Sequence, residues 1–288
     1  MMQWPPLASA ANPKARNPNG TSSCCHAEIV AATGNGTPQP RHAGQPGSSV
    51  GDGSVVSRET TGFVPWDHPP AEAETVFGRR LVLAQRYVAL LAGPGIERGL
   101  IGPRELPRLW HRHVLNCAVV HEALLEGQSV ADVGSGAGLP GVVLAVARPD
   151  LQVTLVEPLL RRSRFLDEVV AELGLRNTVV IRARAEELAG KLMVQAVTAR
   201  AVAPLEQLAR WSLPLLSEGG RLLALKGASV VDEVAHAATA LQTMGAVSWT
   251  VREFGRGIVD PPTRVAVIEV GRPVREAVSR RRRRKGGR

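Results

Sequence analysis

The sequence of 288 residues predicts an α/β protein: a doubly wound sheet of five parallel strands with a late antiparallel hairpin and an N-terminal helical extension. Three observations favour this class. Short β-rich runs alternate with helical patterns from residue 128 onward, a glycine-rich segment follows the first run, and two late β-rich runs have no helix between them. Such alternation is typical of parallel sheets, and adjacent β-rich runs are typical of a hairpin.

Composition divides the chain into four predicted regions. Gly, Pro, Ser, Thr and Asn make up 34 of the first 70 residues, so this segment cannot bury enough apolar surface to offset its ordering entropy. We therefore expect a disordered segment over 1–66, a helical lead-in over 67–127, a sheet domain over 128–273 and a basic disordered tail over 274–288.

Hydrophobic periodicity predicts the elements in order. A first helix begins at Ala71 and ends at Gly93-Pro94, and Pro103 opens a second helical stretch that runs to Gly127. The strands that follow are predicted over 129–133, 152–157, 178–182, 195–199, 221–226, 247–254 and 264–270. The helices between them are predicted over 140–147, 160–173, 185–190, 204–216 and 229–244.

Charge and composition exclude several classes of protein. The formal net charge is +9, but residues 280–288 alone carry seven positive charges, so the body of the chain is close to neutral. That tail is either an interaction tail that binds polyanions by counterion release or a solvated terminus. No run of 18 apolar residues and no secretory leader is present, and three cysteines cannot build a disulfide framework. We expect a cytoplasmic protein without a membrane segment.

The glycine-rich segment 134–141 carries two overlapping motifs. Gly134, Gly136 and Gly138, preceded by Asp132, are typical of the first motif of S-adenosylmethionine methyltransferases, whereas Gly136, Gly138 and Gly141 match the dinucleotide fingerprint. Glu157, at the end of the second strand, suits either cofactor because an acid there accepts hydrogen bonds from ribose hydroxyls.

Three features favour S-adenosylmethionine over a dinucleotide. A dinucleotide site places a pyrophosphate at the helix N-terminus, and S-adenosylmethionine has none. The carboxylate of Asp132 would repel a pyrophosphate and suits the amino-acid end of S-adenosylmethionine. The hairpin after the fifth strand is also a methyltransferase feature. A nucleotide-cofactor oxidoreductase remains the alternative.

Longer motifs make the resemblance more specific. DVGSGAGLPG, VEPLLRRSRFLDEVVAELGL, RAEEL, TARAVAPLEQL and GGRLLALKG resemble the RsmG (GidB) family in order and spacing, over about residues 77–270. The resemblance implies a Rossmann-like class I methyltransferase that transfers a methyl group from S-adenosylmethionine to N7 of a guanine in the 530 loop (the guanine-527 type) of 16S rRNA. The family usually has Asp-Ser where this chain has Asn116-Cys117, so no carboxylate role is expected there.

The resemblance also implies site residues. Its cofactor contacts fall on Gly134, Leu139, Ala185, Glu186 and Arg200, and the glycine-loop argument adds Asp132, Gly136, Gly138 and Glu157. The candidates for a catalytic role are Arg200 and Lys226. Lys226 is either a substrate or phosphate contact or a lysine that extends to solvent at a strand end.

Other residues are candidates for RNA or metal binding. The RNA-binding candidates are His113, Arg161, Arg162, Arg164 and Lys226, with a packed histidine and a solvated arginine face as the alternatives. His113 and Cys117 lie one helical turn apart, but two ligands do not make a zinc site, so no metal is expected. Asp260-Pro261-Pro262 imitates a methyltransferase motif and is interpreted as a turn.

The sequence therefore predicts a monomeric rRNA guanine-N7 methyltransferase whose partner is 16S rRNA, the 30S subunit or an assembly intermediate. Guanine N7 is already a lone-pair acceptor, so the reaction needs no general base, in keeping with the absence of an obvious acid–base pair in the sequence. A non-catalytic RNA-binding protein with a vestigial cofactor pocket is a further alternative.

Overall fold

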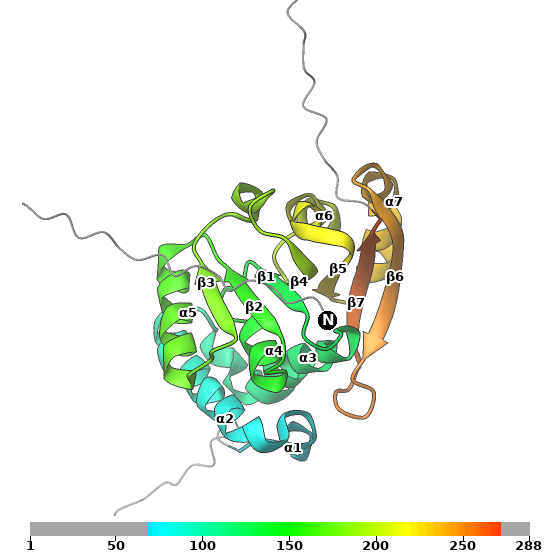
Figure 1. Ribbon diagram of the computed structural model, residues 1–288. Helices are drawn as coiled ribbons and strands as arrows, with labels where there is room; N and C mark the ends of the chain where they lie inside the picture. The colour runs from blue at the N-terminus through cyan, green and yellow to red at the C-terminus, as the bar shows by residue number, and fades with distance from the viewer. Residues whose placement is uncertain (1–67, 272–288) are drawn as a thin grey trace, which may run out of the picture. The chain divides into compact units, whose positions relative to one another are not determined.

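A computed structural model describes residues 68–271 of the chain (Figure 1). The predicted disorder of residues 1–66 and of the basic tail therefore lies outside the described residues. Within 68–271, no helix is long and apolar enough to cross a bilayer.

The strands and helices follow the predicted order. The strands are β1 (Ser129–Val133), β2 (Gln152–Val156), β3 (Thr178–Ile181), β4 (Val194–Arg200), β5 (Leu216–Lys226), β6 (Ala246–Phe254) and β7 (Thr263–Val270). The helices that accompany them are α4 (Gly141–Ala147), α5 (Leu160–Leu173), the 3-10 turn η6 (Ala185–Leu188), α6 (Leu205–Ser212), the 3-10 turn η7 (Leu213–Leu215) and α7 (Val230–Thr243).

The strand order in the sheet is β3-β2-β1-β4-β5-β7-β6. The first five strands are parallel, and β7 pairs antiparallel with both β5 and β6. This confirms the predicted fold class of five parallel strands with a late antiparallel hairpin. The order reverses between β1 and β4, and ligands of open α/β sheets bind beside the carboxyl ends of the strands at such a point.

Neighbouring residues of the central strands point to opposite faces and belong to two separate cores. Val130 packs with α4, α5 and the N-terminal helices, whereas Ala131 packs with α6 and α7. In β5, Leu223 belongs to the same core as Val130, and Leu222 belongs to the same core as Ala131. Because side chains alternate along a strand, helices cover both faces of the sheet, as Figure 1 shows.

The start of β5 differs from the prediction by five residues. β5 begins at Leu216, not at Arg221, because the strand continues through Gly219-Gly220 as an irregularity. The pairing with β4 shifts register there, from Val194↔Leu216 to Ala196↔Arg221. Paired glycines commonly indicate a turn, but here they lie in a β-bulge.

The N-terminal part is a run of short helical turns against one face of the sheet. It comprises α1 (Ala71–Phe77), η1 (Gly78–Arg80), α2 (Leu81–Leu90), η2 (Leu91–Gly95), η3 (Pro103–Arg108), η4 (Leu109–Leu115), α3 (Asn116–Ala118) and η5 (Val119–Ala123). The prediction that Gly93-Pro94 ends the first helix is wrong. The chain passes Pro94 in one wider π turn, η2, which accommodates the ring that would otherwise collide with the preceding turn.

Candidate active site

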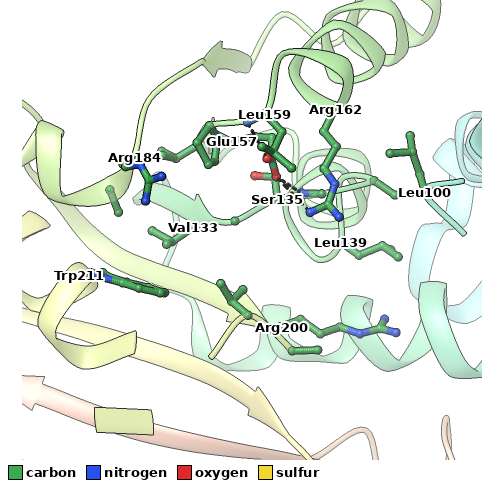
Figure 2. A pocket seen from close by; sticks show the side chains of 18 of the residues that line it. Leu100, Val133, Ser135, Leu139, Glu157, Leu159, Arg162, Arg184, Arg200 and Trp211 are labelled. Carbon is green, nitrogen blue, oxygen red and sulfur yellow. Dashed lines mark hydrogen bonds and ion pairs between the residues drawn. The ribbon is translucent and has the colours of Figure 1, made fainter. Parts of the chain in front are cut away.

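A cavity of about 550 Å³ lies at the carboxyl ends of the parallel strands, beside the point where the strand order reverses. Its walls come from the glycine loop after β1, the ends of β2 and β4, the turn after β3 and part of the N-terminal helical run. Figure 2 shows side chains from these elements directed toward one space. The predicted cofactor residues that line it are Gly134, Gly136, Leu139, Glu157, Ala185, Glu186 and Arg200, and the predicted RNA-binding candidates that line it are His113 and Arg162.

The glycine loop is held to β2 and to the N-terminal helices. The amides of Gly134 and Ser135 donate to the carbonyl of Val156 at 2.9 and 3.2 Å. The buried hydroxyl of Tyr87 donates to the carbonyl of Ala137 at 2.8 Å, and burial raises the pKa of Tyr87 well above its ordinary value. The loop is therefore anchored before any ligand arrives.

Gly134 adopts a left-handed conformation at φ 69°. A Cβ there would lie 2.9 Å from Cγ1 of Val202, in the loop after β4. Ala201 in that loop also has a positive φ, 53°, a strained geometry for a residue with a side chain. Val202 lies against Gly134, so the loop after β4 contacts the glycine loop at the edge of the cavity.

Asp132 and Gly138 do not line the cavity, and their contact with the cofactor stays a prediction. Asp132 is fully buried, and its carboxylate accepts hydrogen bonds from the Gly141 amide at 3.0 Å and the Thr198 hydroxyl at 3.2 Å. Burial raises its pKa to about 6. A Cβ on Gly138 would lie within 3 Å of Val142 and Tyr87. Both residues shape the loop from beneath.

The position of Asp132 also argues against a dinucleotide. Its carboxylate accepts a hydrogen bond from the Gly141 amide at the start of α4. A dinucleotide-binding fold would place a pyrophosphate at this helix N-terminus. A phosphate group there would meet a carboxylate in place of free amides. The oxidoreductase alternative is therefore not supported by the geometry.

Glu157 presents an oriented carboxylate at the cavity. The residue is only 1% exposed. Its Oε2 accepts from the Gly136 amide at 3.0 Å and its Oε1 from the Leu159 amide at 2.9 Å. Arg162 Nη1 lies 4.0 Å from Oε2, and Figure 2 shows these two side chains approaching one another at the rim. Each oxygen keeps a further lone pair for a ligand hydroxyl.

Sequence reasoning missed two apolar walls of the cavity. Trp211 of α6 is partly buried and lines the side nearest Ala185 and Glu186, and Leu159 lines the side next to Glu157. Figure 2 shows the flat indole directed into the space. The only sequence signal was an aromatic residue on an amphipathic helix, which is more often a core residue. Its role depends on how α6 packs over the sheet.

Arg200 is held by the N-terminal helical run. Its Nη2 donates to Nδ1 of His113 at 2.6 Å, and its Nη1 contacts the His113 carbonyl at 3.3 Å and the Cys117 thiol at 3.1 Å. Glu206, the first acid after β4 in sequence, pairs with Arg210 and not with Arg200. Three of five guanidinium N–H groups are thereby used.

His113 is fixed in one tautomer by its two partners. Because arginine cannot accept a hydrogen bond, Nδ1 is the acceptor and Nε2 carries the proton. Nε2 donates to Oε2 of Glu105 at 2.7 Å. Burial and then the positive charge of Arg200 lower the pKa of His113, so the ring is neutral near pH 7. His113 lines the cavity as a buried residue that positions Arg200.

The remaining candidates for contact with RNA are dispersed. Arg162 lines the cavity, whereas Arg161 and Arg164 line neither of the two cavities described in residues 68–271. Lys226 lies in a second cavity, and its Nζ donates to the Ala203 carbonyl at 2.6 Å and to Glu233 at 2.7 Å. Its side chain is 9% exposed, so the interpretation of a lysine extended to solvent is wrong.

Two further observations bear on metal and thiol chemistry. Within the described residues there is no group of three or more His, Cys, Asp and Glu side chains that could hold a metal ion. Cys117 is buried behind Arg200, and burial raises the pKa of its thiol. It is therefore unsuited to act as a thiolate nucleophile.

A doubly wound sheet with β7 inserted antiparallel, a glycine loop at the reversal of strand order and an acid after β2 defines the Rossmann-like class I methyltransferases. The family model described as rRNA small subunit methyltransferase G (GidB) matches residues 80–260. The chain belongs to this family.

Individual relatives of this chain carry the same name as the family model. Ribosomal RNA small subunit methyltransferase G of Streptomyces avermitilis is 58% identical over 203 residues, which cover 70% of this chain and 85% of that protein. The protein of the same name from Rhodococcus jostii is 56% identical over 209 residues, 71% of this chain and 90% of that protein. The chain is therefore an rRNA methyltransferase that uses S-adenosylmethionine.

Proposed function

We propose that this enzyme methylates N7 of a guanine in the 530 loop of 16S rRNA, with S-adenosylmethionine in the cavity beside the glycine loop. Membership of the family establishes rRNA methylation, and the sequence resemblance implies that the methylated nucleotide is a guanine. The arrangement of Arg200 in the cavity is the observation that supports guanine most directly.

The residues of the cavity fit the cofactor. Its volume of about 550 Å³ lies within the range of small-molecule sites. A Cβ on Gly136 would meet nothing closer than 3.8 Å, so the missing side chain leaves room for a ligand. Glu157 would accept from the ribose hydroxyls, and Ala185 with Glu186 and Trp211 would hold the adenine. When bound, S-adenosylmethionine supplies a methyl group on a sulfonium centre, which the N7 lone pair accepts without loss of a proton.

The side chains around Arg200 suit a reaction without a general base. Both ring nitrogens of His113 are engaged, Nδ1 by Arg200 and Nε2 by Glu105, so the ring is not free to take a proton from the substrate. The guanidinium of Arg200 has hydrogen-bond donors only, so it offers no lone pair to act as a base. Methylation of an exocyclic amine or of a ring carbon would require a general base or a thiolate nucleophile, whereas methylation of N7 requires neither.

Arg200 is suited to recognise guanine. Two of its five N–H groups are not used by the contacts to His113 and Cys117. Guanine carries the O6 acceptor next to N7, whereas adenine carries an N6 amino donor there. A donor from Arg200 to O6 would select guanine and leave the N7 lone pair open to the methyl group.

The deep, narrow major groove of an RNA helix does not expose N7, so the guanine is offered from a loop or an unstacked strand. We propose that the monomeric enzyme acts in the cytoplasm on 16S rRNA within the 30S subunit or an assembly intermediate.

The test is mass spectrometry of 16S rRNA digests from cells that lack the gene, complemented with wild type or with Arg200→Ala. We expect wild type to restore one N7-methylguanosine in the 530-loop fragment and the variant to restore it at least 100-fold more slowly, with a smaller loss of thermal stability. A methyl group at another position or nucleotide would overturn the proposal, and near-normal transfer by Arg200→Ala would overturn the role of Arg200.

A further inference from the structure

A second cavity, of about 890 Å³, is not used by the proposed chemistry. One wall is the N-terminal helical run at His111, Arg112 and Asn116, and a second wall is the loop between β6 and β7 together with Thr263 and Arg264 at the start of β7. Its floor is the end of β5 at Lys226 and Gly227. The cavity therefore belongs to three elements that are distant in sequence.

The two cavities open at the ends of neighbouring strands. Arg200, which lines the first, pairs in register with Leu225, and Lys226 of the second follows directly. The helical segment η4 contributes to both, because His113 lines the first cavity and Arg112 the second. An RNA strand that places one nucleotide at Arg200 would reach the second cavity with the adjacent nucleotide.

The walls of the second cavity are fixed to one another. The hydroxyl of Thr263 donates to the Asn116 carbonyl at 3.0 Å, and the Gly255 amide donates to Glu122 at 3.1 Å. The Cβ that Gly255 lacks would lie 2.5 Å from Val119. The β6–β7 loop is thus packed closely on the helical run, and the cavity is formed before a ligand binds.

The cations that face this space outnumber the carboxylates. Arg112, Lys226, Arg256 and Arg264 line it, together with Glu72 and Asp260. Lys226 donates to Ala203 and Glu233, which uses two of its three N–H groups, and its charge is paired with Glu233.

The exposed arginines of the walls keep donors for a ligand. Their side chains are 59%, 79% and 43% exposed for Arg112, Arg256 and Arg264. Their ion pairs run to Glu105 and Glu253, which do not line the cavity. Exposed pairs of this kind are weak, so a phosphate can compete for the guanidinium groups.

The character of the lining indicates which part of a nucleic acid it would bind. Among the described residues that line the cavity, His111 is the only one with an aromatic ring, so the lining offers no extended aromatic surface on which successive bases could stack. Arginines without such a surface are typical of contacts to the phosphate backbone, which position the strand without reading its sequence.

We propose that the second cavity binds a phosphodiester of the rRNA strand adjacent to the target guanine. This inference rests on the proposed function, because it takes the base to be at Arg200. It makes Arg112 and Arg264, one from each wall, positioning contacts for the substrate.

The test compares two double variants that each remove two arginines from exposed ion pairs. Arg112→Ala/Arg264→Ala removes one from each wall. Arg86→Ala/Arg210→Ala, whose ion pairs with Glu172 and Glu206 lie outside both cavities, is the matched control. Binding of a 530-loop RNA oligonucleotide and of a scrambled one is measured against salt concentration, and S-adenosylmethionine binding is measured by calorimetry.

We expect the slope of log K against log salt to fall by about 1.4 in magnitude for the wall variant, about 0.7 for each lost phosphate contact. Extrapolated from 1 M to 0.1 M salt, this is about 25-fold weaker binding. The loss should be the same for both oligonucleotides, KM for RNA should rise, and cofactor affinity should stay at the wild-type value. Arg112→Lys/Arg264→Lys should restore most of the slope.

Equal slopes in the wall and control variants would overturn the proposal. A loss confined to the 530-loop sequence would also overturn it, because the cavity would then read bases. Failure of the proposed function is distinguishable: wild-type enzyme would methylate a different position in the mass spectrum, while the difference in slope between the two double variants would persist.

Discussion

Nη2 of Arg200 lies 2.6 Å from Nδ1 of His113, and this contact joins the end of β4 to a helical turn 87 residues earlier in the chain. The histidine can accept only while it is neutral. Glu105 holds the opposite nitrogen as a donor, and the hydrogen bond from His113 lowers the pKa of Glu105. The protonation of one buried ring therefore controls whether Arg200 keeps its position in the cavity.

Acid should weaken both the fold and the activity through His113. Its pKa in the folded state is lowered from 6.5, first by burial and then by Arg200. The unfolded chain therefore binds the proton more readily, so the stabilisation is fully present above about pH 6.5 and declines as the pH falls toward the folded pKa. Turnover should fall over the same range, because an imidazolium N–H would face the Arg200 N–H groups.

His113→Asn tests this relationship, since its amide oxygen can accept from Arg200 but does not titrate. We expect the acid limb of the kcat profile to flatten in His113→Asn, while His113→Ala loses activity at every pH. An acid limb in His113→Asn identical to that of wild type would contradict the assignment.

Asp132 should make the protein less stable as the pH rises through 6. Burial raises its pKa from 3.8 to about 6, so between these values the folded state binds the proton more tightly than the unfolded state. Its contribution is greatest below about pH 4 and declines by about 3 kcal/mol as the pH rises through 6. Denaturant unfolding of Asp132→Asn should show no such decline, because the amide does not ionise.

The same variant tests where Asp132 acts. The amide oxygen of Asp132→Asn can still accept from Gly141, so cofactor affinity should stay within about threefold of wild type. Asp132→Leu leaves that amide without a partner, and we expect it to cost about 1–3 kcal/mol. A large loss of cofactor affinity in Asp132→Asn at unchanged stability would instead support direct contact with the cofactor.

Glu157→Gln should weaken S-adenosylmethionine binding by about 10- to 100-fold, as expected for a hydrogen bond to a charged group. Both carboxylate oxygens accept from backbone amides, so one end of a glutamine would turn a donor toward another donor. Calorimetry measures the affinity. Glu172→Gln, on the exposed face of α5, is the control and should bind normally.

Gly134→Ala should lower both stability and cofactor affinity, and Val202→Ala should recover part of the loss. Two costs are combined: a left-handed φ of 69°, worth about 1–2 kcal/mol, and the close approach of Val202 at 2.9 Å. The second substitution removes only the steric cost. A double-mutant cycle in thermal unfolding measures the coupling, and strict additivity would show that the two loops do not meet as described.

Much of the fold was predictable because its signals are local. The alternation of Val130 with Ala131 places β1 between two cores, and the spacing of Gly134 and Gly136 marks the loop that lines the cavity. Such patterns depend on neighbouring residues alone. They sufficed for the fold class, for the sequence of strands and helices along the chain and for the wall formed by Glu157.

The partners of the charged groups were not predictable in this way. Nothing near Arg200 in sequence indicates His113 as its partner, and nothing near Lys226 indicates that the Ala203 carbonyl would accept a hydrogen bond from it. Asp132 lies beside the glycine loop in sequence, yet its side chain turns beneath the loop to Gly141. Hydrogen bonds between distant segments form only after helices and strands have packed, because packing sets which donors and acceptors are removed from water and must find one another.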